Sequence, residues 1–297
     1  MIHAFRALGL LAVALGLPAF PQQAPRASDA GPRTAQIYVS VLGPRDVPMT
    51  GLSAADFVVR EDGVSREVLR AAPATDPLQI VLVVDDSQAA TDAIQPLREG
   101  LRAFVDALRG RAEIGIVTVA DRATSLVPPT TDTAALHKGI DRIFARSGSG
   151  AYLLDAVLDT SRGFTRRKAS RPVIVVVTME GVEFSNLHYQ NVLDALAASG
   201  AALHVLAVGT PGSSMADEIR NRNQVIAEGT EMTGGRRDQL LTPSALAETL
   251  PRVAAELLNQ YVVTYSRPES LIPPEKVKVT VSRPEATVRA RTRAAGR

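Results

Sequence analysis

The sequence predicts an α/β fold with a mainly parallel, doubly wound sheet, flanked by a small all-β domain. Through the middle of the chain, apolar strands alternate with amphipathic helices, the pattern of a parallel sheet covered by helices on both faces. On both flanks, short strands alternate apolar and polar residues instead. Because the β segments lie on both sides of the α/β region, we expect them to pair into one sheet, with that region inserted between them.

The N-terminal residues predict an export signal followed by a leader. Arg6 gives a small positive region, and an apolar stretch at 7–17 follows it. That stretch is shorter than the roughly 20 apolar residues of a membrane span, so it favours a secretory signal peptide at 1–24, cleaved between 19 and 30, over an uncleaved anchor. Residues 25–33 are rich in Pro, Gln and Ala and predict a disordered leader. We therefore expect an exported protein, periplasmic or secreted, with no membrane span after signal removal.

Residues 34–76 predict the N-terminal part of the β domain. IYVSVL at 37–42 alternates apolar and polar side chains and indicates a strand. FVVR at 57–60 indicates a second strand, and the glycine of Glu61-Asp62-Gly63 suits a hairpin turn that leads to a return strand at 64–71. Between the strands at 37–42 and 57–60, SAAD from Ser53 predicts a short capped helical turn.

Residues 77–259 predict the α/β domain. LQIVLVV at 78–84 is a continuous apolar run, typical of a strand buried on both faces. Apolar residues recur with a 3.6-residue period through 91–108 and predict an amphipathic helix. The strand expected at 124–127 follows the one at 113–120 closely enough to be an antiparallel edge strand. Further strands are expected at 172–178, 201–208 and 234–240, and further helices at 132–145, 152–164, 187–199, 215–228 and 242–259.

Residues 260–293 return to the alternating pattern and predict the C-terminal part of the β domain. Three strands are expected, at 260–266, 276–282 and 287–292. Arginines at 289, 291 and 293 suit a solvated face or an exposed strand edge, where charge discourages aggregation.

The composition excludes several kinds of site. The 297 residues include no cysteine, so disulfides, thiolate metal sites and a cysteine nucleophile are absent. A net charge of +2 gives no argument for a nucleic-acid partner. The four histidines have no metal-ligand spacing, and His204 lies in an apolar strand where a core position is expected.

Two motifs bracket the α/β region. GLSAADFVVREDG at 51–63 precedes it, and QYVVTY at 260–265, with a later strand ending in VRAR at 288–291, follows it. These motifs, with the order of strands and helices between them, resemble bacterial exported proteins in which a von Willebrand factor type A domain lies between two β segments. The resemblance covers 35–293 and implies that fold, whereas a fold alone does not fix a function.

The resemblance also implies a place for a metal-ion-dependent adhesion site, at the carboxyl ends of the strands. Such sites hold Mg²⁺ with oxygen ligands and leave one position for a partner's carboxylate. The family takes these ligands from a D-x-S-x-S loop, a later threonine, and an aspartate after the fourth strand. Asp85 and Ser87 match the first two positions. The other family positions are occupied by Ala89, Ala151 and Met179.

Other carboxylates lie close to the implied metal site. A one-residue shift would place Glu180 at the position of Met179, and Asp86 and Glu183 are near in sequence. We expect Asp85, Ser87 and Glu180 to be what remains of the site, which would bind Mg²⁺ or another divalent cation weakly or not at all. Asp85 and Ser87 would then serve as helix caps or as hydrogen-bonding groups of the loop.

We therefore expect an exported, non-enzymatic module, for adhesion or as a scaffold, that binds an unidentified protein partner and needs no cofactor. Its binding face would be the loops at 85–91, 147–152 and 179–187. Two alternatives stay open. One is a protein binder that depends on a divalent cation at Asp85, Ser87 and Glu180. The other is a hydrolase, which would need a pocket joining Asp85, Asp86 and a histidine.

Overall fold

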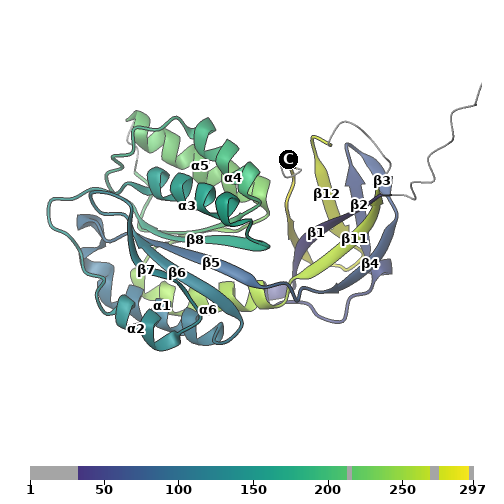
Figure 1. Ribbon diagram of the computed structural model, residues 1–297, viewed down its shortest axis with the longest axis horizontal. Coiled ribbons are helices and arrows are strands. Elements are labelled where there is room, and N and C mark those ends of the chain that lie inside the picture. Colours follow the sequence, from purple (N-terminus) through teal and green to yellow (C-terminus); the bar gives the residue numbers. More distant parts are fainter. Residues whose placement is uncertain (1–32, 213–215, 268–273, 294–297) are drawn as a thin grey trace, which may run out of the picture. The chain divides into compact units, whose positions relative to one another are not determined.

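The computed structural model describes residues 33–212, 216–267 and 274–293 (Figure 1). The expected signal peptide and nearly all of the expected leader lie outside these residues, so they stay predictions. Within the described ranges, none of the helices has the length and apolar character needed to cross a membrane.

A six-stranded sheet forms the centre of the α/β part, in the order β10-β9-β8-β5-β6-β7. Five strands are parallel, and β7 pairs antiparallel with β6 at one edge. The predicted mainly parallel sheet with one antiparallel edge strand is therefore confirmed. The strands are β5 (Leu78–Val84), β6 (Ala112–Thr118), β7 (Thr124–Thr130), β8 (Arg171–Met179), β9 (Ala202–Val208) and β10 (Arg237–Leu240).

Helices cover both faces of this sheet (Figure 1). Leu82 and Val84 of β5 belong to the apolar cluster on one face, and Val81 and Val83 to the cluster on the other, which explains the uninterrupted apolar run of that strand. On one face lie α1 (Ile94–Ala107), α2 (Thr133–Ile140) and α6 (Leu246–Leu258), and on the other α3 (Leu153–Arg167), α4 (Tyr189–Ser199) and α5 (Asp217–Thr233). Short 3₁₀ helices η3 (Gln88–Ala93) and η4 (Pro243–Ala245) lead into α1 and α6.

Helix α2 differs from its predicted extent. Asp132 caps it, with its carboxylate accepting the N–H groups of Ala134 and Ala135. The helix ends at Ile140, however, and not at 145. The chain turns there, and Arg98 of α1 donates to the carbonyl of Ile143 at 2.8 Å, which holds the following segment outside the helical path.

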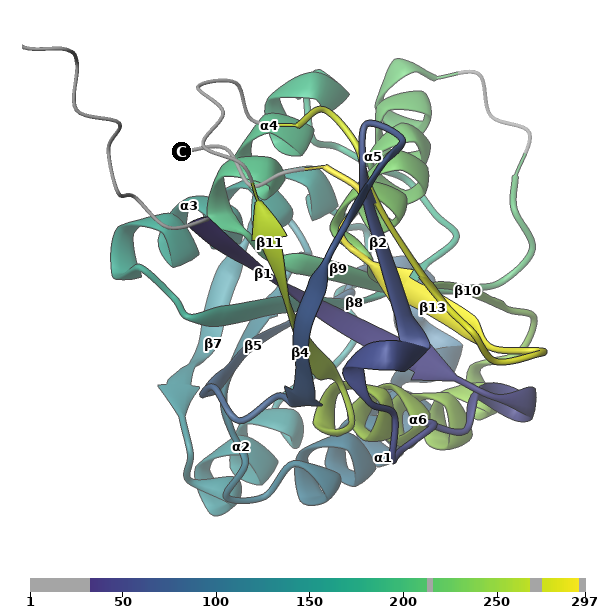
Figure 2. The same ribbon diagram turned by 90° about the vertical axis from the view of Figure 1, so that its right-hand side faces the viewer.

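The flanking segments pair with each other in two antiparallel sheets. One has the order β13-β1-β11-β4 and the other β12-β2-β3, so each contains strands from both ends of the chain (Figure 2). The prediction that the N- and C-terminal β segments pair is confirmed, but they form two sheets and not the single sheet expected, because the chain passes from one sheet to the other between β3 and β4. Their bounds are β1 (Arg33–Leu42), β2 (Phe57–Glu61), β3 (Val64–Arg66), β4 (Val68–Pro73), β11 (Tyr261–Arg267), β12 (Val277–Val281) and β13 (Thr287–Ala290), with 3₁₀ turns η1 (Pro44–Asp46) and η2 (Ala54–Asp56).

The single return strand predicted at 64–71 is in fact two strands in different sheets. The chain changes sheet at Glu67, because β3 pairs with β2 while β4 pairs with β11. The carbonyl of Glu67 accepts the N–H of Ser266 at this corner. The predicted capped turn before β2 is present, since Asp56 accepts both the N–H and the hydroxyl of Ser53.

A buried cluster of charges links the antiparallel sheets to the α/β part. The guanidinium of Arg236 pairs with Asp46 at 3.0 Å, with Asp238 at 2.6 Å and with Glu256 at 3.3 Å. Arg289 of β13 pairs with the same Glu256 at 3.0 Å. Glu256 is only 1% exposed, so removing one partner would leave a buried charge unbalanced, at a cost of about 3–5 kcal/mol.

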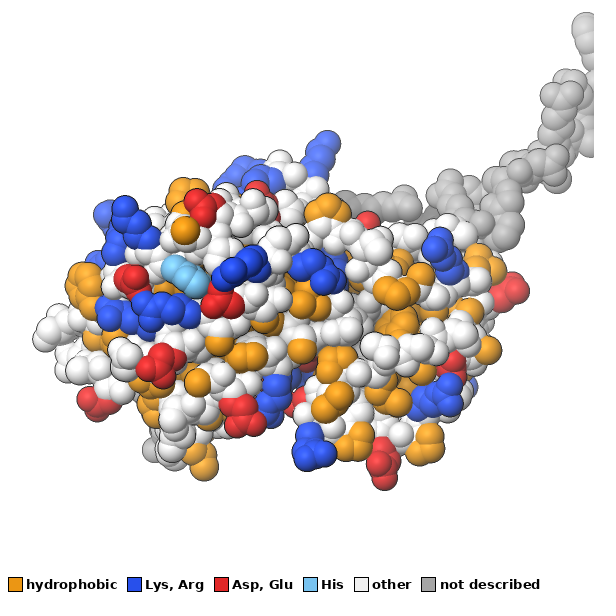
Figure 3. Space-filling model, turned by 90° about the horizontal axis from the view of Figure 1, so that it is seen from below, with side chains coloured by type: hydrophobic (Ala, Val, Ile, Leu, Met, Phe, Trp, Pro, Cys, Tyr) orange, Lys and Arg blue, Asp and Glu red, His pale blue; other side chains and the backbone are white. Residues whose placement is uncertain are grey.

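Charged side chains are mixed in sign on the face of the α/β part that carries α1 and α2 (Figure 3). Lys and Arg side chains alternate with Asp and Glu across it, and apolar side chains are scattered between them. This face therefore has no extended basic stripe of the kind that binds a phosphate backbone.

Gly234 is required where the C-terminal strand meets α5. It ends α5 at a φ of 72°, and a Cβ there would lie 2.3 Å from the carbonyl carbon of Ala290. We expect Gly234→Ala to lower the free energy of unfolding by about 2–4 kcal/mol, because the methyl group both clashes and disfavours the positive φ. Urea denaturation measures the change. Gly212→Ala is the control, since its Cβ would meet nothing within 4 Å. An equal loss in both variants would contradict the packing argument.

Candidate binding surface at the carboxyl edge of the sheet

Asp85 joins the carboxyl ends of β5 and β8. One of its carboxylate oxygens accepts the N–H of Ser87 at 2.9 Å. The other accepts the N–H of Met179 at 2.9 Å and the hydroxyl of Thr178 at 3.3 Å. The residue is 1% exposed. Its carboxylate therefore satisfies backbone donors on two neighbouring strands that would otherwise be buried without a partner.

Asp86 likewise accepts backbone N–H groups, in this case from the loop after β6. Its Oδ1 accepts the N–H groups of Val119 at 3.0 Å and Ala120 at 2.7 Å. Its Oδ2 lies 3.4 Å from the guanidinium of Arg146. Burial raises the pKa of Asp86, while the backbone donors and Arg146 oppose that rise. Asp86 thereby fixes the loop after β6 against the loop after β5.

Glu183 and Ser185 cap helix α3 from the loop that follows β8. Tyr152, the residue before the helix, makes no capping hydrogen bond with its side chain. Instead, Glu183 Oε1 accepts the N–H of Leu153 at 3.1 Å, and Ser185 Oγ accepts the N–H of Asp155 at 3.2 Å. Burial raises the pKa of Glu183 to about 7, and its Oε2 is buried with no hydrogen-bond partner.

Ala151 lies in a short backbone ladder that ties three loops together. Its N–H donates to the carbonyl of Val182 at 2.9 Å, and its carbonyl accepts the N–H of Phe184 at 2.8 Å. On the other side it forms a β-bridge with Ala120. The position where the family has a threonine ligand is therefore part of a bonded backbone segment, and these loops hold a fixed shape.

The structure brings two of the three expected metal residues together and gives the third another partner. Asp85 and Ser87 share a hydrogen bond at the end of β5. Glu180 forms an ion pair with Arg222 of α5 at 2.8 Å. In the parts of the chain that the structure describes, no three or more His, Asp and Glu side chains are grouped so that they could hold a metal ion.

Met179 and Ala89, at two of the other family positions, pack against neighbouring parts of the domain. Met179 is 4% exposed and belongs to the apolar core under the edge. Ala89 lies against Gly181, where an added Cβ would be 2.7 Å from the Ala89 methyl group.

The histidines have separate surroundings. His204 is fully buried on β9, and burial lowers its pKa to about 4. His188 caps α4, with Nδ1 accepting the N–H of Gln190 at 3.3 Å. Among the described residues, no histidine is a hydrogen-bond partner of Asp85 or Asp86.

Apolar side chains are exposed on the loops that were expected to bind. Val182 is 59% exposed and Phe184 47% exposed. The Phe184 ring packs against Gly150, where a Cβ would lie 2.6 Å from it, and meets Tyr152 edge-on at 5.9 Å between centroids. The sequence analysis singles out the loop at 179–187 but not these two side chains, because only the path of the loop decides which of its side chains face outward.

Gln88 joins two of these loops, a contact that the sequence motifs do not identify. Its Oε1 accepts the N–H of Gly148 at 2.8 Å, and its own N–H donates to the carbonyl of Ser149 at 3.3 Å. It thus ties the glycine-rich loop to the loop after β5, and all three expected binding loops are joined.

Residues 80–181 match a family model described as the von Willebrand factor type A domain. The α/β part is a von Willebrand factor type A domain. A UPF0353 protein of Mycolicibacterium paratuberculosis is 28% identical over 149 residues, which cover 45% of this chain and 44% of that protein. The chain thus spans less than half the length of the curated relative that it matches.

Two solved structures share the fold. A von Willebrand factor type A protein from Catenulispora acidiphila superposes with a TM-score of 0.50 at 12% identity, over 86% of this chain and 71% of that one. Proximal thread matrix protein 1 from the mussel byssus, with a zinc-occupied adhesion-site motif, superposes with a TM-score of 0.51 at 17% identity, over 66% of this chain and 50% of that one. At these identities the likeness shows the fold alone.

The pKa of Glu183 predicts a pH-dependent stability that Glu183→Gln removes. In the folded protein this pKa is about 7, above the ordinary 4.5, so stability is full at low pH and is lost as pH rises from about 4.5 to 7. The glutamine keeps an acceptor for the N–H of Leu153 and never ionises. We expect the variant to exceed the wild type in stability by about 1–3 kcal/mol at pH 8 and by little at pH 4.5.

Urea denaturation of both proteins across this pH range measures the difference. The comparison with the wild type is needed because His204 also makes stability depend on pH, in the opposite direction. Its lowered pKa removes stability as pH falls below 6.5. Both proteins share that histidine, so its contribution cancels. A difference between variant and wild type that does not change with pH would contradict the account of Glu183.

Proposed function

We propose that this chain is an exported, non-enzymatic module, for adhesion or as a scaffold, that binds a protein partner without a metal ion. The binding face consists of the loops at 85–91, 147–152 and 179–187. The observation that carries the proposal is the exposed pair of Val182 and Phe184 on loops that backbone hydrogen bonds hold in place. Rigid apolar anchors at the centre of a surface are the usual source of binding energy between proteins.

The state of the carboxylates supports binding without a metal. Mg²⁺ requires nearly octahedral oxygen ligands and gives up its water reluctantly. At this edge, both oxygens of Asp85 already accept hydrogen bonds from neighbouring groups of the protein. A cation would have to displace those donors and would gain no hydroxyl from Ala89 or Ala151. The loops would therefore serve as the binding surface by themselves.

The same contacts support a non-enzymatic role. A hydrolase built on Asp85 and Asp86 needs a carboxylate that can reach a substrate, whereas these side chains are 1% and 3% exposed. The proposal of export rests on the charged and apolar pattern of residues 1–24.

Phe184→Ala tests the proposed surface. Chemical crosslinking in the envelope of the source cells, followed by mass spectrometry, identifies the partner, and calorimetry with the purified partner gives the affinity. We expect Phe184→Ala to weaken binding by about tenfold or more, since an exposed aromatic anchor is lost. Leu69→Ala is the control, because Leu69 is similarly exposed, at 46%, but lies on β4.

The same calorimetry in Mg²⁺ and in EDTA separates the two modes of binding. The proposal expects equal affinity in both. Affinity that disappears in EDTA would favour the cation-dependent alternative at Asp85, Ser87 and Glu180. Equal affinity of Phe184→Ala and the wild type would exclude this loop as the binding surface.

A further inference from the structure

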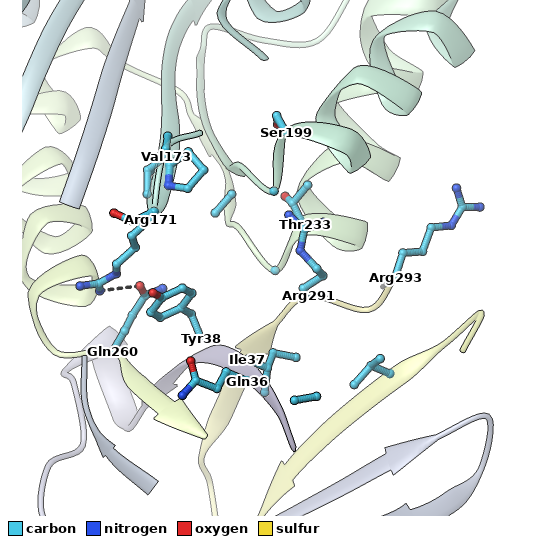
Figure 4. A pocket seen from close by; sticks show the side chains of 18 of the residues that line it. Gln36, Ile37, Tyr38, Arg171, Val173, Ser199, Thr233, Gln260, Arg291 and Arg293 are labelled. Atoms are coloured by element: carbon cyan, nitrogen blue, oxygen red, sulfur yellow. Dashed lines mark hydrogen bonds between the residues drawn. The ribbon is translucent and has the colours of Figure 1, made fainter. Parts of the chain in front are cut away.

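A pocket of about 320 Å³ lies at the amino edge of the central sheet, the edge opposite the proposed binding loops (Figure 4). The first residues of β8 and β9 form one side of it, and β1 of the antiparallel sheet forms the other. Its volume lies at the lower end of the range for sites that hold small molecules.

Arg171 is a buried cation in the wall of this pocket. It is 5% exposed and donates to the carbonyl of Leu257 and, at 2.7 Å, to the side-chain oxygen of Gln260 (Figure 4). Its guanidinium also lies 5.2 Å from the centroid of the Tyr38 ring. Its Nε is buried with no hydrogen-bond partner. Asp76, which accepts the Tyr38 hydroxyl at 2.9 Å, attracts Arg171 electrostatically without an ion-pair contact.

Arg291 is a second cation in the wall of the pocket. It donates to the carbonyls of Ala197 at 3.5 Å and Ala201 at 3.4 Å, and the described residues offer it no carboxylate. Burial lowers its pKa, as expected for a charge that no anion balances. The carbonyls that both arginines bind lie at or near the ends of helices α6 and α4, where a cation is favoured. These contacts position the guanidinium groups. Among the described residues, Asp76 is an electrostatic partner of Arg171, whereas Arg291 has no carboxylate partner.

Glu61 is the one carboxylate among the described residues that line the pocket, and other groups already occupy it. It pairs with Arg66 at 3.0 Å and with Arg267 at 3.4 Å, and it accepts the hydroxyl of Tyr265 at 2.9 Å. The cavity therefore carries a net positive charge beside apolar walls that include Ile37 and Val173.

We propose that this pocket binds a small organic anion. The negative group, a carboxylate or a phosphate ester, is balanced by Arg171 and Arg291, because guanidinium groups pair with both kinds of anion. The apolar body of the ligand lies against Ile37 and Val173. Nothing in this site involves the loops at the carboxyl edge, so its occupancy is independent of the proposed protein-binding surface.

Calorimetry with benzoate and phenyl phosphate tests the proposal. Benzyl alcohol serves as the uncharged probe, and inorganic phosphate serves as the anion that lacks an apolar group. We expect one site per chain for the organic anions, and binding at least about tenfold weaker for benzyl alcohol and for inorganic phosphate. The tighter of benzoate and phenyl phosphate identifies the preferred anionic group.

Arg291→Gln should weaken the binding of the tighter anion at least about tenfold, because one of the two balancing charges is lost. Arg70→Gln is the control, since that arginine is exposed on β4 and does not line the pocket. Ala35→Leu, which fills the pocket from β1 without removing a charge, provides a second variant if Arg291→Gln does not fold. The proposal is overturned by equal affinity for benzoate and benzyl alcohol, by unchanged affinity in both pocket variants, or by no binding at about 10 mM anion.

Discussion

Buried carboxylates that accept backbone N–H groups hold the carboxyl edge of the central sheet. Asp85 joins β5 to β8, Asp86 joins β5 to the loop after β6, and Glu183 caps α3. A carboxylate taken out of water without partners is costly, and so is an unsatisfied N–H group. Here the buried carboxylates accept hydrogen bonds from the backbone N–H groups, and these hydrogen bonds hold the loops in one conformation. The exposure of Val182 and Phe184 depends on that conformation.

The two edges of the sheet differ in their charge balance. At the carboxyl edge, negative side chains are matched by backbone donors and by Arg146. At the amino edge, Arg171 and Arg291 donate hydrogen bonds to neutral oxygens, and the described lining of the pocket contains more arginines than carboxylates. The pocket there exists because β1 and the C-terminal strand lie together, and the buried cluster around Arg236 and Glu256 holds that arrangement. The fold thus supports two separate surfaces with different chemistry.

Much of the fold can be predicted from local sequence patterns, because burial on two faces leaves an uninterrupted apolar run such as 78–84. The division of the return strand into β3 and β4 at Glu67 cannot be predicted in this way, since the sheet that β4 joins depends on its pairing with the distant strand β11. At the site, spacing identifies Asp85 and Ser87. It does not reveal that Asp85 accepts the N–H of Met179, 94 residues away, or that Glu180 faces Arg222. Those partners meet only through the packing of distant strands and helices.

The central claim is that backbone donors, and not a metal ion, satisfy Asp85. Asp85→Asn tests it, because the amide NH₂ must face one of those backbone N–H groups. Urea denaturation in MgCl₂ and in EDTA should give the wild type the same stability in both. The variant should lose about 1–3 kcal/mol equally in both conditions. If Mg²⁺ stabilised the wild type and had no effect on the variant, Asp85 would be a metal ligand and the account would be wrong.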